Sequence, residues 1–123
     1  MKRVTPHLRE LLAETVTPLA VYQRLKALSP VRFLFESVTG GEQVARFSFL
    51  GAAPREIYRL YPDRLEVERD GRRSDLPGKP LAALRTLVEG YSTPELPVPF
   101  AGGFVGTFGF DLVRLVERIP ARP

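Results

Sequence analysis

The sequence predicts an α+β fold: one domain in which a mostly antiparallel sheet is flanked by short helices. Two segments repeat apolar residues at helical spacing, and each begins next to a proline. Short alternating segments around them are separated by turn-forming residues, which is typical of strands joined as meanders. The 123 residues, 44% of them apolar, suffice for one domain with a core of its own.

The first helix is expected to begin at Thr17 and Pro18, because threonine can cap a helix and proline suits the first helical position. Ser29 and Pro30 should end it. The helical spacing predicts one apolar face, made of Val21, Tyr22, Leu25 and Leu28.

Residues 31–37 and 45–50 alternate as strands do, and the turn-forming residues 39–42 join them. An antiparallel pair is therefore expected. Residues 56–61 and 64–69 predict further strands. A tight hairpin should follow at an Asp-Gly pair, because both central positions of such a turn favour positive φ. These two residues are Asp70 and Gly71.

A second helix is expected to begin at Lys79 and Pro80 and to end at Gly90. Its buried side should carry Leu81, Leu84, Leu87 and Val88. Residues 92–99 contain too many prolines for a helix or a strand, so they predict a loop.

The glycine-rich residues 100–110 match neither the dinucleotide-binding spacing nor the P-loop spacing. We therefore expect a strand whose glycines allow another element to approach closely. Asp111 is predicted to cap a short helix. The apolar residues of that helix are Leu112, Leu115, Val116 and Ile119.

Composition excludes several classes of function. The chain has no cysteine, which excludes disulfides and thiolate chemistry, and its lone histidine, His7, cannot form a histidine cluster for a metal. No apolar run approaches the roughly 18 residues of a membrane helix, and no export signal is visible, so a cytoplasmic protein is expected. The absence of asparagine together with 12 prolines indicates a thermophilic source.

The charged residues alone do not indicate a catalytic or nucleic-acid-binding function. The net charge of +4 comes from 18 basic residues scattered among 14 acidic ones, which does not favour nucleic-acid binding. Asp111, Arg114 and Glu117 have helical spacing that fits a salt-bridged surface better than a ligand site. Glu36 and Ser37 end a strand, where they could meet a small polar ligand or simply face solvent. No catalytic or metal-binding residue is expected.

Three stretches together resemble the amino-terminal region of anthranilate synthase component I, a chorismate-utilising enzyme. The first, TPLAVYQRL, covers residues 17–25. The second is FLFESVTGGE at residues 33–42, followed by RFSFLG at residues 46–51. The third begins as GGFVG at residue 102 and ends at residue 120. The resemblance therefore spans nearly the whole chain.

The resemblance implies a tryptophan pocket that serves feedback inhibition. Its residues would be Pro18, Phe35, Glu36, Ser37, Phe47 and Ser48. In such a pocket Ser37 hydrogen-bonds the amino-acid headgroup, Glu36 attracts its ammonium, and the proline and both phenylalanines contact the indole. The alternative is that these residues only pack the sheet against the first helix. Phe35 stands where the family has leucine, which should reshape the pocket rather than abolish it.

The same resemblance implies that residues 1–123 are the amino-terminal regulatory domain of a larger enzyme with two layers of sheet. The carboxy-terminal chorismate-binding domain, with its magnesium and catalytic groups, is absent, so this chain should be inactive alone and need no cofactor. The whole enzyme converts chorismate and glutamine or ammonia to anthranilate and pyruvate, with a glutamine amidotransferase subunit as partner. Aminodeoxychorismate synthase component I and a stand-alone ligand-binding module remain alternatives.

Overall fold

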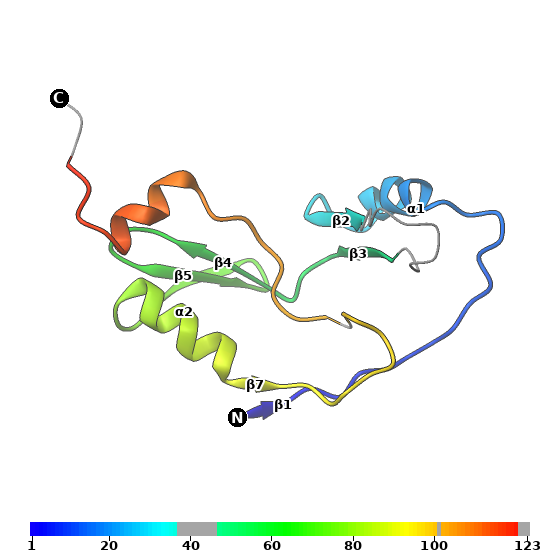
Figure 1. The fold of residues 1–123 in the computed structure, drawn as a ribbon, viewed down its shortest axis with the longest axis horizontal. Helices are drawn as coiled ribbons and strands as arrows, with labels where there is room; N and C mark the ends of the chain where they lie inside the picture. Colours follow the sequence, from blue (N-terminus) through cyan, green and yellow to red (C-terminus); the bar gives the residue numbers. More distant parts are fainter. Residues whose placement is uncertain (37–46, 101, 121–123) are drawn as a thin grey trace. The chain divides into compact units, whose positions relative to one another are not determined.

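The elements of the fold are α+β, as the sequence predicts, and Figure 1 follows them along the chain. The computed structural model describes residues 1–36, 47–100 and 102–120. These residues belong to two compact units. The first unit combines Met1–His7 with Glu56–Pro123, and the second unit is Leu8–Arg55.

The second unit begins with helix α1, Pro18–Arg24, at the predicted place. The Thr17 hydroxyl accepts a hydrogen bond from the amide of Ala20 at 3.2 Å, which satisfies one of the free donors at the helix start. The chain then tightens into the 3₁₀ helix η1, Leu25–Ala27. Leu28, which was predicted on the buried face, is 71% exposed. That assignment is wrong because η1 ends at Ala27, so Leu28 is its C-cap residue and lies beyond the helical turn that carries Leu25.

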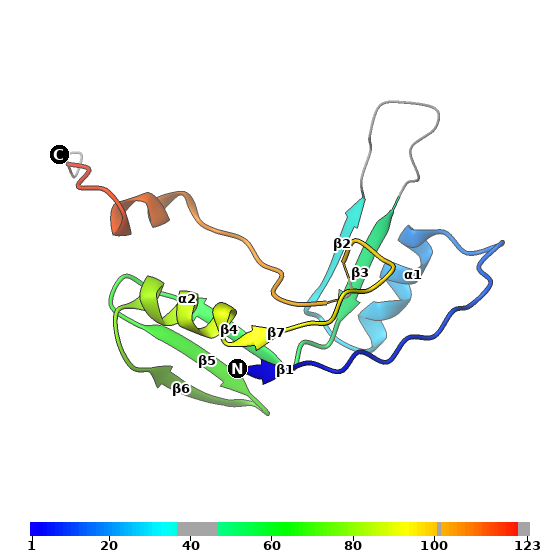
Figure 2. The same cartoon turned by 60° about the horizontal axis from the view of Figure 1, so that its bottom comes forward.

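Strands β2, Arg32–Glu36, and β3, Ser48–Ala52, form the predicted antiparallel pair. Figure 2 shows α1 running in the opposite direction to β2, alongside the pair. The predicted turn at residues 39–42 lies outside the described residues, as do Ala45 and Arg46 of the expected second strand.

The two faces of the β2–β3 pair differ in character. The Arg32 guanidinium lies over the Tyr22 ring of α1, 4.7 Å from its centroid, so the face that carries Arg32, Leu34 and Glu36 is turned toward α1. The opposite face is aromatic. On it the rings of Phe33 and Phe35 lie 5.2 Å apart.

The first unit contains the three-stranded antiparallel sheet β4-β5-β6. Its strands are Glu56–Leu60, Leu65–Arg69 and Arg72–Leu76. The turn between β5 and β6 has positive φ at both central residues, 51° at Asp70 and 74° at Gly71, so the predicted hairpin is confirmed.

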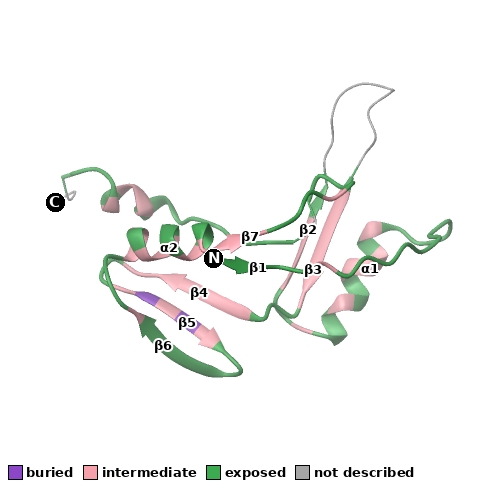
Figure 3. Cartoon of the chain, turned by 90° about the horizontal axis from the view of Figure 1, so that it is seen from below, coloured by how far each residue is buried: buried purple, intermediate pink, exposed green. Residues whose placement is uncertain are grey.

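Helix α2, Pro80–Glu89, contacts β5 and supplies the apolar cover of this sheet. Leu65 and Val67 of β5 are the most buried apolar residues, with 1% and 8% exposure, and Figure 3 shows both in purple. The predicted helix is confirmed. Val88 is nevertheless 45% exposed, so its assignment to the buried side is wrong; it stands in the last turn, where the chain leaves the helix for β7.

A short parallel ladder between β1, Lys2–Arg3, and β7, Tyr91–Ser92, was not predicted from the sequence. Its strands are two residues long and stand almost ninety residues apart, so neither alternation nor a local turn could reveal it. Ser92, the first residue of the predicted loop, belongs to β7 instead, while residues 93–99 contain neither helix nor strand, in agreement with the rest of that prediction.

The strand expected at residues 100–110 is absent from the described part of that segment, residues 102–109. A strand needs a hydrogen-bonded neighbour, and the structure pairs this segment with none. Only Phe104 is packed on both sides: its ring centroid lies 5.9 Å from that of Tyr58 and 5.6 Å from that of Tyr91.

The last helix, η2, is a 3₁₀ helix over Phe110–Leu115 and is capped by Gly109. The prediction that Asp111 caps it is wrong, because Asp111 lies inside the first turn and accepts a hydrogen bond from Arg114 at 3.2 Å. Val116 is its C-cap, and Ile119 lies beyond its end. The Asp111–Arg114 contact agrees with the predicted salt-bridged surface.

Gly51 allows the close packing of the β2–β3 pair, and replacing it should destabilise the second unit. Gly51 stands opposite Phe33, and a Cβ at this position would lie 2.8 Å from Cζ of the Phe33 ring. We expect Gly51→Ala to lower the free energy of unfolding by about 1–3 kcal/mol through overpacking. Urea titration followed by circular dichroism measures this change.

The matched control is Gly106→Ala, because a Cβ on Gly106 meets no atom within 4 Å. That variant should stay within about 0.5 kcal/mol of the parent chain. Equal stabilities for the two alanine variants would contradict the close approach of Phe33 to Gly51.

Candidate functional site

The candidate site is the end of the hairpin where β2 stops and β3 begins. The strand register places Glu36 directly opposite Ser48. The Ser48 hydroxyl donates a hydrogen bond to Oε1 of Glu36 at 3.4 Å. This is long for an O–H···O bond, so it is weak and easily exchanged for a better partner. The pair therefore offers a carboxylate and a hydroxyl to a ligand, and the carboxylate has spare acceptor capacity.

Pro18 belongs to the same side of the second unit. It is half-buried in the first turn of α1, and α1 runs antiparallel to β2 (Figure 2). The start of the helix consequently lies toward the end of the hairpin that carries Glu36 and Ser48. The structure thus brings three of the six predicted residues to one side of the strand pair.

The two predicted phenylalanines lie elsewhere. Phe35 neighbours Glu36 along β2 and so points to the other face, where it is 50% exposed. Phe47 immediately precedes β3 and is 42% exposed; its ring stacks on that of Phe49, with 6.2 Å between centroids. Ser37 lies outside the described residues.

Sequence reasoning overlooked Arg32 on the face turned toward α1. Its guanidinium covers Tyr22, and its buried Nε has no hydrogen-bond partner among the described residues. The signal was the even spacing of Arg32, Leu34 and Glu36, which places both charges on one face. Arg32 and Glu36 are four residue steps apart along β2, so their Cα atoms lie about 13 Å apart and one amino-acid headgroup cannot span both positions.

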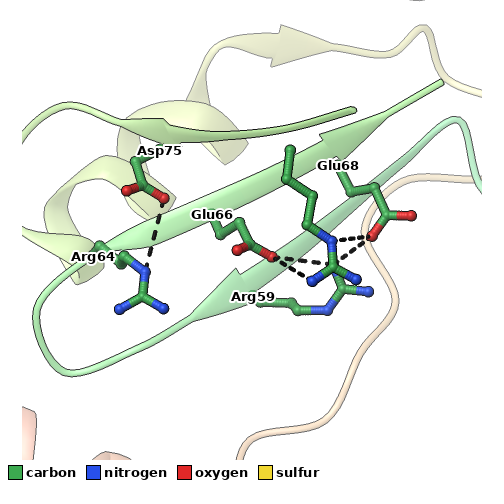
Figure 4. A network of polar contacts seen from close by, with 6 residues as sticks. Arg59, Arg64, Glu66, Glu68 and Asp75 are labelled. Carbon is green, nitrogen blue, oxygen red and sulfur yellow. Dashed lines mark hydrogen bonds and ion pairs between the residues drawn. The ribbon is translucent and has the colours of Figure 1, made fainter. Parts of the chain in front are cut away.

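A second group of charges covers the outer face of the β4-β5-β6 sheet (Figure 4). Arg59 of β4 donates to Glu68 at 2.7 Å and to Glu66 at 3.4 Å. Arg73 of β6 donates to the same Glu68 at 3.1 Å. The hydrogen bond from Arg59 is the main reason that the pKa of Glu68 lies below its ordinary value. Each charge here has an opposite partner, so the cluster is a structural ladder rather than a binding site.

On the inner face of the same sheet, Glu56 accepts hydrogen bonds from the Tyr58 hydroxyl and from Arg69, whose Nε lies 2.7 Å away. The Tyr58 hydroxyl is the largest influence that lowers the pKa of Glu56, and burial opposes it. Burial, together with the hydrogen bond to Glu56, raises the pKa of Tyr58. The hydrogen-bonding groups of Glu56, Tyr58 and Arg69 therefore satisfy one another.

The described ranges contain no group of three or more histidine, cysteine, aspartate or glutamate side chains that could hold a metal ion. Within the same ranges, the helices all lack the length and apolar character needed to cross a bilayer.

The lowered pKa of Glu56 predicts a loss of stability in acid. Its ionised form is favoured in the fold, so this contribution is complete above the unfolded-state pKa of about 4.3 and disappears as the pH falls through the lower folded-state value. Glu56→Gln should therefore be less stable than the parent chain at neutral pH, and the difference should shrink below about pH 4. Urea titrations across this range measure it.

The control for this experiment is Glu89→Gln at the exposed end of α2. It should leave stability nearly unchanged at every pH. A stability difference between Glu56→Gln and the parent that persists undiminished into acid would contradict the proposed role of the ionised carboxylate.

The curated relatives of this chain agree on one protein. Anthranilate synthase component 1 of Thermus thermophilus is 40% identical over 123 residues, which cover 98% of this chain and 26% of the relative. The Mycobacterium tuberculosis protein of the same name is 39% identical over 127 residues, which cover 98% of this chain and 24% of that relative. The Synechocystis protein of the same name is 35% identical over 120 residues, which cover 94% of this chain and 23% of that relative.

No family model matches the chain, and no solved structure matches it. The chain spans about a quarter of the length of the curated relatives it matches. Their agreement over nearly all of its residues nevertheless shows that the chain is similar to part of anthranilate synthase component 1, at 35–40% identity.

Proposed function

We propose that these residues form the tryptophan-binding, feedback-regulatory part of an anthranilate synthase component 1. The observation that carries the proposal is the pairing of Glu36 with Ser48 at the end of the hairpin, beside the start of α1. A carboxylate there attracts the ammonium of an amino acid, and a charge-assisted hydrogen bond is stronger than the weak one it replaces. Ser48 would then be free to turn toward the same headgroup.

An amino acid held against α1 would have its side chain beside Pro18. Phe35 and Phe47 lie on or near the other face, so they would contact a ligand that extends around the end of the hairpin. Both are sufficiently exposed to supply that contact. Ser37 follows Glu36 directly in the sequence and remains a candidate for the headgroup.

Regulation suits this part of the protein better than catalysis does. Conversion of chorismate and ammonia to anthranilate and pyruvate, with magnesium, would be carried out by the remaining three quarters of the family protein, and a glutamine amidotransferase subunit would supply the ammonia. Tryptophan would inhibit because it binds the inactive arrangement of the whole protein more tightly than the active one.

The isolated 123-residue chain should form no anthranilate from chorismate, with either ammonia or glutamine and with magnesium present. Its described residues hold no metal-binding cluster, and the paired charges of the β4-β5-β6 sheet already satisfy one another. Anthranilate fluorescence, compared with a blank without protein, measures this activity. Product above the blank would place catalytic groups in this chain.

Tryptophan inhibition is best measured in a chimaera in which residues 1–123 replace the matched segment of the Thermus thermophilus relative. We expect Glu36→Gln, Ser48→Ala and Ser37→Leu each to raise the half-inhibiting tryptophan concentration. Losing a hydrogen bond with a charged group costs about 1.5–3 kcal/mol, which corresponds to a roughly ten- to hundredfold change. Turnover without tryptophan should stay near its parent value.

The matched controls are Ser74→Ala on β6 and Glu89→Gln on α2, which should leave inhibition unchanged. If Glu36→Gln and Ser48→Ala remain inhibited at the parent tryptophan concentration, the hairpin end is not the tryptophan site. A parallel fall in turnover and stability would show that these residues only pack the strands.

A further inference from the structure

The glycine-rich segment before η2 leaves its backbone open. A Cβ built on Gly102, Gly106 or Gly109 meets no atom within 4 Å. In the described part of the chain, residues 103–108 take part in no backbone hydrogen bond. Figure 2 shows the segment, in orange, as a drawn-out stretch without helix or strand. Its amide and carbonyl groups are therefore available to another strand.

The side chains of this segment have the two-residue period of a strand. Phe104, Phe108 and Phe110 share one side of such a strand, with Gly106 between the first two. Phe104 is anchored between Tyr58 and Tyr91. Phe108 is 72% exposed and Phe110 93% exposed, so the apolar side is anchored at one end and uncovered at the other.

The helix that follows extends this uncovered surface. In a 3₁₀ helix every third residue aligns, so η2 has three ridges. The polar ridge is the Asp111–Arg114 ion pair, and the second ridge, Leu112 and Leu115, is half-buried. The third ridge is apolar and consists of Phe110, Val113 and Val116, the last of which is 73% exposed. Contiguous apolar exposure of this kind marks a surface that packs against another polypeptide.

The relatives indicate which polypeptide that is. The matched region covers 98% of this chain, so it includes nearly all of residues 102–120, yet it makes up only 24–26% of each relative's length. The relatives thus carry the same segment in a protein about four times as long. We propose that residues 103–109 pair as an added strand with the remaining three quarters of anthranilate synthase component 1, which also covers Phe108, Phe110 and Val116.

This contact has the chemistry of strand addition. Main-chain hydrogen bonds hold the added strand, and alternate side chains enter apolar positions of the partner. Glycine at residue 106 lets the partner's backbone approach without meeting a side chain. The inference rests on the similarity to anthranilate synthase component 1 and needs no tryptophan, so it can fail while the proposed regulatory function stands.

Amide hydrogen exchange tests the proposal on two proteins, the free 123-residue chain and the chimaera with the Thermus thermophilus remainder. We expect amides 103–109 to exchange freely in the free chain and at least about a hundredfold more slowly in the chimaera, because they are hydrogen-bonded there. Gly106→Val should restore fast exchange in the chimaera and leave the melting temperature of the free chain unchanged. The control Ala13→Val adds similar bulk at an exposed site in the second unit, and it should change neither the slow exchange of amides 103–109 in the chimaera nor the melting temperature of the free chain.

Equal exchange at amides 103–109 in both proteins would overturn the proposal. Protection that appears in the free chain and increases with its concentration would also overturn it, because the occupant would then be a second copy. If the chimaera does not fold, the unaltered Thermus thermophilus protein replaces it: slow exchange in the stretch matched to residues 103–109 supports the proposal, and fast exchange there refutes it.

Discussion

Successive side chains of a strand point to opposite faces, and this constraint decides what each unit can offer. In the first unit it turns Leu65 and Val67 toward the apolar cover of α2, while Glu66 and Glu68, their neighbours in β5, form the outer charge ladder. In the second unit it places Glu36 with Ser48 on one face and Phe35 on the other. Candidate site residues that are adjacent along a strand, such as Phe35 and Glu36, therefore lie on two different surfaces.

Features that depend on neighbouring residues could be predicted from the sequence. Thr17 with Pro18 fixes the start of α1, and Asp70 with Gly71 fixes the β5–β6 turn, because capping and positive φ are local properties. Features that need a partner far away in the sequence could not be predicted in this way. The β1–β7 ladder joins residues almost ninety positions apart, and the glycine-rich segment has the pattern of a strand but no neighbour with which to pair in this chain.

The candidate site shows the same division between local and distant information. Family resemblance selected Glu36 and Ser48, and the register brings their side chains together. Sequence alone gave no reason to include Arg32, whose position depends on the packing of α1 over the strand pair. Leu28 was misplaced because apolar spacing does not reveal where the helix ends, and Leu28 lies just beyond the end of η1.

The charges on β6 have a consequence for how such a protein is made. β6 is an outer strand of the β4-β5-β6 sheet, and its exposed residues include Arg72, Arg73 and Asp75. Charged side chains along an edge discourage pairing with a foreign strand. If this quarter leaves the ribosome first, synthesis of the other three quarters takes tens of seconds at about 5–20 residues per second. During that interval the charged side chains of β6 disfavour pairing of this edge with strands of neighbouring nascent chains.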